Sequence, residues 1–196
     1  MNAPRIRPAG RLRERWQLRI ELLDVNPLVW RRLLLPADIA LPKLHRVFQI
    51  ALGWTDSHLH EFVIGGVRYA HADPEWAAEL KQTKEHGVAL TQALGPDARG
   101  FDYLYDFGDD WHHLVVVEER LAEPAKTGPT IICMDGENAC PPEDVGGPPG
   151  YADFLDAIAD PQHEEHRNCL EWCDGAFDPA RFDRAAVNRA LGKLRA

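Results

Sequence analysis

Histidines and aspartates gather in two short segments of the sequence, and together they have the composition of a metal site. His58 and His60 are two residues apart, while Asp106, Asp109 and His113 lie in a second segment. On a strand, residues two apart project from the same face, so the two histidines would present a pair of imidazoles. Imidazole and carboxylate groups are ligands of zinc, manganese and iron. If the two segments are neighbours, these five residues predict a divalent metal site. The alternative is that they hydrogen-bond to turns and loops, because the chain has no HExxH and no paired CxxC spacing.

A second set of charged residues is associated with a segment rich in proline and glycine. Residues 139–151 contain four prolines and three glycines, which disfavour a helix or a central strand and predict a long ordered loop. Glu143 and Asp144 are adjacent, so on an extended backbone they point to opposite sides and make a poor acid and base pair. We expect Asp144 to accept backbone amides and brace the loop. A bidentate bond from Arg31 or Arg32 to one of these carboxylates is also expected.

The cysteines and the central serine favour no further chemistry. Cys133 and Cys140 are seven residues apart, and Cys169 and Cys173 are four apart. These spacings match none of the common zinc ribbons, so reduced thiols are expected rather than a structural zinc. Ser57 lacks the flanking glycines of a nucleophile elbow, which argues against a serine hydrolase.

The elements that must position these residues follow from hydrophobic periodicity. Apolar alternation predicts strands over 16–23, 29–35, 58–64, 67–70, 101–107 and 111–118, and a 3.6-residue period predicts a helix over 41–52. After the proline-rich segment the pattern becomes helical: one helix carries Tyr151 and Ile158, a second starts at Asp160 and a third at Asp178. Strands first and helices last predict an α+β fold, with a mostly antiparallel sheet of about five or six strands covered by helices and a C-terminal helical segment.

Length and charge set the domain organisation. The 196 residues suffice for one domain with a large core, which the six tryptophans should help to fill. Residues 1–50 contain ten Lys and Arg against four Asp and Glu, whereas the remainder contains twelve against twenty-seven. We therefore predict a flexible basic arm over 1–14 and a single domain over 15–194. The net charge of −9 argues against a protein that coats nucleic acid, so nucleic acid would bind only through the arm. No apolar run suits a bilayer and no secretory signal is evident, so a cytoplasmic location is expected.

Several long motifs, taken in order, resemble the Ri-plasmid ORF-three-like family. They are residues 30–32, the helix segment 44–50, residues 53–62, 105–113 and 139–151, and the tail segments 170–172 and 177–179. The resemblance spans about residues 15–190. It implies an α+β domain found in bacteria and archaea, often on plasmids or near insertion sequences, without an established activity. Some relatives carry a resolvase-like label (TnpR-like), but Ser57 lies in an acidic, histidine-rich segment unlike the arginine-rich surroundings of a recombinase nucleophile. Many relatives have cysteine where this chain has Val145, which argues against thiols of this segment as required ligands.

The sequence favours a binding or interaction module linked to mobile genetic elements over an enzyme. Its functional surface is predicted where the 58–60 strand, the 106–113 hairpin and the 139–151 segment meet, and the residues assigned to it are Arg31, Arg32, His45, Trp54, Asp56, Glu143 and Asp144. The partner would be a protein or a nucleic acid and not a membrane. The alternative function is a metal-dependent hydrolase or nuclease, with a divalent cofactor held by His58, His60, Asp106, Asp109 and His113.

Overall fold

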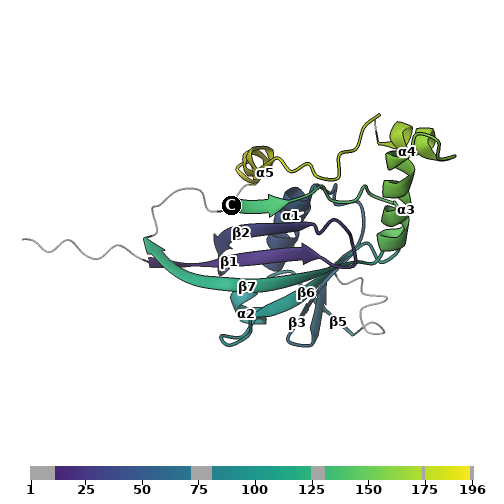
Figure 1. Ribbon diagram of the computed structural model, residues 1–196. Helices are drawn as coiled ribbons and strands as arrows, with labels where there is room; N and C mark the ends of the chain where they lie inside the picture. Colours follow the sequence, from purple (N-terminus) through teal and green to yellow (C-terminus); the bar gives the residue numbers. More distant parts are fainter. Residues whose placement is uncertain (1–11, 72–80, 125–130, 174, 195–196) are drawn as a thin grey trace, which may run out of the picture.

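The computed structural model describes residues 12–71, 81–124, 131–173 and 175–194, and these residues form one large sheet with helices beside it (Figure 1). The strands are β1 (Leu12–Leu22), β2 (Trp30–Pro36), β3 (His60–Ile64), β4 (Val67–Ala70), β5 (Gln82–Lys84), β6 (Gly100–Tyr105), β7 (Trp111–Pro124) and β8 (Ile132–Glu137). The helices are α1 (Leu41–Leu52), α2 (Leu90–Ala93), α3 (Gly147–Ala159), α4 (His166–Trp172) and α5 (Arg184–Leu191). The α+β class expected from the sequence is confirmed.

The sheet has the strand order β5-β4-β3-β6-β7-β1-β2-β8. All neighbouring pairs are antiparallel except β4 and β5, which are parallel. The described residues thus contain eight strands rather than the expected five or six. The two unexpected strands, β5 and β8, are the two edges of the sheet. Edge strands are held by backbone hydrogen bonds on one side only, so they need no regular apolar pattern that the sequence could reveal.

The centre of the sheet follows the alternation seen in the sequence. Trp16, Leu18, Ile20 and Leu22 of β1 are all buried, and β1 pairs along its full length with β7. β1 begins at Leu12, inside the segment expected to be a basic arm, while residues 1–11 of that arm lie outside the described part of the chain. Among the described residues, no helix is long and apolar enough to cross a membrane.

Helix α1 lies against the sheet and begins and ends as its sequence predicts (Figure 1). Proline stands in its first turn, where no amide donor is needed, and Gly53 ends it in the left-handed conformation with φ 104°. The buried face of α1 includes two polar side chains, His45 and Gln49. Both contact Asp56, in the loop that carries His58. Helix α5 packs beside α1 and β8.

Helices α3 and α4 stand together beyond one end of the sheet (Figure 1). The expectation that residues 139–151 form a loop throughout is wrong, because α3 starts at Gly147 and contains Pro148 and Pro149 in its first turn. Those prolines are compatible with a helix start for the same reason as in α1.

The starts of the last two helices also differ from the expectation. Asp160 accepts a hydrogen bond from the amide of Gln162 (2.9 Å), and Asp178 accepts one from the amide of Ala180 (3.0 Å). Both aspartates therefore close short turns, whereas α4 begins at His166 and α5 at Arg184. An aspartate followed by proline starts a turn as readily as a helix, so the local signal could not separate the two.

Candidate functional site

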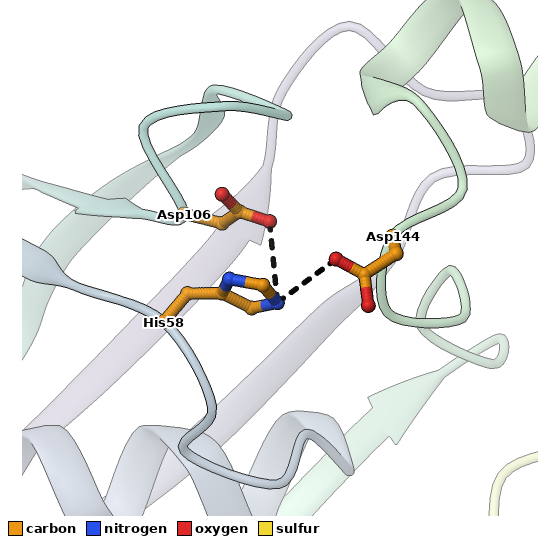
Figure 2. Close-up of side chains that lie close together, drawn as sticks. All are labelled: His58, Asp106 and Asp144. Atoms are coloured by element: carbon orange, nitrogen blue, oxygen red, sulfur yellow. Dashed lines mark ion pairs between the residues drawn. The ribbon is translucent and has the colours of Figure 1, made fainter.

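Three side chains from distant parts of the sequence converge at one end of the sheet: His58, Asp106 and Asp144 (Figure 2). His58 precedes β3, Asp106 follows β6, and Asp144 lies just before α3. The His58 Nε2 atom is 3.2 Å from Oδ1 of Asp144 and 3.6 Å from Oδ2 of Asp106. In the described part of the chain this is the one group of three or more potential ligands whose atoms all lie within 4.8 Å of one another.

Asp106 is oriented by its own turn. Its backbone is left-handed (φ 55°), and Oδ1 accepts from the amides of Gly108 (3.0 Å) and Asp109 (3.4 Å). The side chain is 9% exposed. Because Oδ1 is occupied by the turn, Oδ2 is left to face His58, as Figure 2 shows.

Glu143 supplies a third carboxylate, held slightly farther away. Its Oε1 accepts from the amide of Thr55 (2.8 Å) and the hydroxyl of Tyr105 (3.1 Å), while Oε2 is 3.8 Å from His58 Nε2. Burial, reinforced by the charge of Glu143, raises the pKa of Tyr105, so its hydroxyl remains a donor. Tyr105 and Thr55 were not predicted as site residues. Tyr105 stands directly before Asp106 in one of the motifs, which is the signal that could have identified it.

The segment that carries Glu143 and Asp144 is anchored from two sides. Trp54 donates from Nε1 to the carbonyl of Pro141 (3.1 Å), and Asp109 Oδ2 accepts from the amide of Gly146 (3.1 Å). A Cβ at Gly147, which has φ +70°, would lie 2.5 Å from the carbonyl oxygen of Asp109, so only glycine allows this approach. Asp109 therefore braces the segment, a role expected of Asp144.

The electrostatics of the cluster call for a proton or a metal ion at Nε2 of His58. The Nε2 atom of His58 is buried and forms no hydrogen bond of acceptable geometry in the described structure, yet three carboxylates lie within 3.8 Å of it. An Nε2 atom that carries no proton would direct its lone pair at negative oxygens, which is unfavourable. A proton on Nε2 or a metal ion between the groups removes that repulsion.

A model of the plasmid pRiA4b ORF-3-like proteins matches residues 14–186. The chain belongs to this family. The uncharacterized protein y4hQ of Sinorhizobium fredii (strain NBRC 101917 / NGR234) is 40% identical over 182 residues, which are 92% of this chain and 92% of that protein. The crystal structure of MM3350, a protein of unknown function from Methanosarcina mazei Go1, has a TM-score of 0.79 at 29% identity and covers 89% of this chain and 98% of that chain. These findings confirm the family resemblance and the fold class.

Two of the histidines assigned to the metal set lie elsewhere. β3 begins at His60, so His58 precedes the strand and the alternation rule does not apply to the pair. The His60 ring stacks on His45 at 3.5 Å between centroids, and its Nε2 is 3.0 Å from Oε2 of Glu85. His113 is fully buried on β7, where Nδ1 donates to the carbonyl of Tyr103 (3.0 Å).

His45 and Asp56 support the loop that carries His58. His45 Nε2 donates to Oδ1 of Asp56 (2.6 Å), and its Nδ1 is 2.8 Å from the Tyr103 hydroxyl. Gln49 Oε1 accepts from the Asp56 amide (2.9 Å). Burial, reinforced by the neighbouring His60, lowers the pKa of His45 to about 4. These contacts tie α1 to the loop, so the two polar residues of its buried face are structural supports of the site.

The expected bond from an arginine to Glu143 or Asp144 is absent from the described structure. Arg31 is buried and donates to the carbonyls of Ala51 (2.8 Å), Glu137 (2.7 Å) and Asn138 (2.8 Å). Arg32 pairs with Glu118 instead, with Nε 2.6 Å from Oε2. Successive strand residues face opposite sides of the sheet, which separates the two arginines, and neither side brings a guanidinium to the carboxylates of the proline-rich segment.

The buried histidines predict a loss of stability in mild acid. Burial lowers the pKa of His113 to about 3, against 6.5 for an ordinary histidine. Below pH 6.5 the unfolded chain therefore binds a proton that the folded chain excludes, so the free energy of unfolding falls as the pH drops from 6.5 toward 3. The slope should approach about 1.4 kcal/mol per pH unit from this residue.

Urea denaturation at pH 7.5, 6.0 and 5.0 measures this slope above the range where carboxylates titrate. We expect His113→Gln to be less stable at pH 7.5 but to lose less stability on acidification. The neighbouring variant His112→Gln, at a half-exposed position paired with Asp102, is the control and should keep the wild-type slope. An unchanged slope in His113→Gln would refute the assignment.

Proposed function

We propose that this protein is a binding module whose functional centre is a divalent metal ion held by His58, Asp106 and Asp144. The observation that carries the proposal is the convergence of one imidazole nitrogen and two carboxylate oxygens, from three separate loops, within 4.8 Å of one another. The proposed centre keeps His58 and Asp106 from the five residues that the sequence assigned to a metal site, and it adds Asp144.

The spacing of the ligand atoms supports a metal rather than a set of mutual hydrogen bonds. A tetrahedral zinc with bonds of about 2.0–2.1 Å separates its ligand atoms by about 3.3–3.4 Å. Nε2 of His58 lies 3.2 Å and 3.6 Å from its two carboxylate partners, on either side of that value. The third pair of ligand atoms, from Asp106 and Asp144, lies within 4.8 Å, so an ion between the three groups would draw the two carboxylates toward each other. Imidazole with two carboxylates suits zinc or manganese.

The ligand set is incomplete by itself, which supports a role in binding a further molecule. Three protein ligands leave a fourth position of a tetrahedral ion for water or an external ligand. The side chain of Asp144 is 72% exposed, so that position is reachable from solvent. The alternative hydrolase or nuclease would use the same centre. Glu143, whose Oε2 lies 3.8 Å from Nε2, is the carboxylate placed to accept a proton from a water there.

The family is named for an open reading frame of plasmid pRiA4b. This name supports the further proposal that the module serves mobile genetic elements. The family name does not indicate that the module is a recombinase.

Titration of metal into tag-free, chelator-treated protein tests the proposed centre. Isothermal calorimetry with zinc and with manganese should show one ion per chain for at least one of them. At a free metal concentration 100 times the dissociation constant, binding should stabilise the fold by about 2.7 kcal/mol and raise the melting temperature by about 5–10 °C. No binding heat and no thermal shift with either metal would reject the proposal.

A further inference from the structure

A second feature lies beside the metal-binding residues: a cleft of about 620 Å³ between α3 and α4. Figure 1 shows the two helices beyond one end of the sheet, and α3 joins the hydrophobic core through Tyr151 and Phe154. No residue of α4 is buried. Asp144 lies at the border of the cleft and is the one proposed metal ligand among the residues that line it.

The floor of the cleft is apolar and aromatic. Phe154 and Ala157 of α3 are buried, whereas Trp172 of α4 is 50% exposed. The Trp172 ring meets Phe154 edge to face at 6.0 Å. The exposed half of the Trp172 side chain leaves part of its ring available to a ligand in the wall of the cleft. Four of the five tryptophans in the described residues are buried, and Trp172 is the exception.

The rim of the cleft is acidic. Asp144, Asp153, Asp156 and Glu165 line it, and no lysine or arginine does among the described residues. The carboxylates of Asp153 and Asp156 form no hydrogen bond or ion pair with any described residue. They are three apart on α3 and so project from one side of the helix. The cleft thus combines an apolar floor with two carboxylates that have no ion-pair partner among the described residues; His163, which also lines the cleft, is its one basic side chain.

We propose that this cleft binds an arginine or lysine side chain of a basic segment in a partner protein. Such a side chain has an apolar stem that suits Phe154 and Ala157 and a cationic head that suits the two aspartates. The exposed face of Trp172 adds a cation–π contact. The charge complementarity selects this occupant: nucleic-acid phosphates would be repelled by the rim, and a purely apolar segment would desolvate the carboxylates without a partner.

Fluorescence anisotropy with a labelled peptide of alternating arginine and leucine tests the proposal on the full chain at low salt. The peptide should bind, and its counterpart with glutamate in place of arginine should not. The double variant Asp153→Asn/Asp156→Asn should weaken binding about tenfold, since each exposed charge pair contributes up to about 1 kcal/mol. Trp172→Ala should also weaken it about fivefold.

The matched control is Asp97→Asn/Glu119→Gln, which removes the same charge at exposed positions that do not line the cleft. It should bind the arginine peptide as the wild type does. An equal loss in this control would show general charge attraction and overturn the proposal. The proposal would also be overturned if the arginine peptide did not bind. Binding of a single-stranded oligonucleotide by the wild type, with loss of that binding in Asp153→Asn/Asp156→Asn, would also overturn the proposal.

This proposal does not rest on the metal centre, and His58→Ala separates the two. That variant should lose metal affinity and still bind the arginine peptide, because His58 does not line the cleft. Loss of peptide binding in His58→Ala would contradict the proposal that the cleft binds its ligand independently of the metal centre. Peptide binding by a wild-type chain that takes up no metal would support the cleft and reject the metal centre.

Discussion

Replacing His58 by alanine should lower the metal affinity of this protein at least about 100-fold, because changes even in groups that only orient metal ligands cost 10–100-fold. The imidazole is the single nitrogen ligand of the set, and its Nε2 is the atom that faces both aspartates. Without it, two carboxylates from separate loops remain, one of them largely exposed. Calorimetric titration with zinc and manganese measures the change.

His112→Ala provides a matched control for this prediction. Its Nε2 is 3.1 Å from Oδ1 of Asp102 on the neighbouring strand, so it too is an imidazole paired with a carboxylate. In the described residues, however, this pair has no third ligand atom within reach. The control should therefore keep full metal affinity. Equal affinity in His58→Ala and the wild type would refute the assignment.

Asp106→Asn separates charge from shape at the same centre. An asparagine oxygen can still accept from the amides of Gly108 and Asp109, which hold the aspartate now. The turn should persist while one negative charge is lost. We expect weakened metal binding with a melting temperature of the metal-free protein close to that of the wild type. A large loss of stability would show that Asp106 acts mainly in the turn.

Replacing Arg31 by methionine should lower the free energy of unfolding by about 3–5 kcal/mol, since several buried carbonyls would lose a charged donor. The guanidinium donates to the carbonyls of Trp30, Ala51, Glu137 and Asn138. The residue is 2% exposed, so water cannot easily replace those bonds. Urea denaturation at pH 7.5 measures the loss.

The adjacent Arg32→Met is the control, because it differs in burial and partners but not in chemistry. Arg32 forms a partly exposed ion pair with Glu118, and such pairs contribute at most about 1 kcal/mol. If Arg31→Met does not fold, Arg31→Lys keeps the charge but not the planar fork and should show an intermediate loss. Equal losses for the Met variants at both positions would contradict the role assigned to Arg31.

Arg31 also connects the stability of the fold to the proposed metal centre. It joins β2 to the end of α1 and to residues 137 and 138, and the proline-rich segment with Glu143 and Asp144 begins at the next residue. The same variant should therefore weaken metal binding without touching a ligand. The sequence assigned Arg31 to the functional surface; in the structure its hydrogen bonds are to backbone carbonyls, so we expect it to position that surface rather than to bind a ligand.

The elements that could be predicted from the sequence are those whose signals are local. α1 has proline at its start, glycine at its end and an apolar stripe between them, and β1 alternates buried and less buried residues. The edge strands β5 and β8 lack such a pattern, because their place depends on backbone pairing with a neighbour. The start of α3 inside a proline-rich segment was missed because proline is unfavourable in a helix interior but suits a first turn.

The candidate site shows the same division. The sequence by itself determined the family, the α+β class and the residue types of the site, because these depend on motifs, periodicity and composition. Only the tertiary structure decided that His58 rather than His60 or His113 faces the carboxylates, and that Asp144 joins Asp106 while Asp109 braces the segment. The physical reason is that a ligand set joins loops far apart along the chain. Their relative placement depends on sheet order and on anchoring contacts such as that from Trp54 to Pro141, which no local pattern encodes.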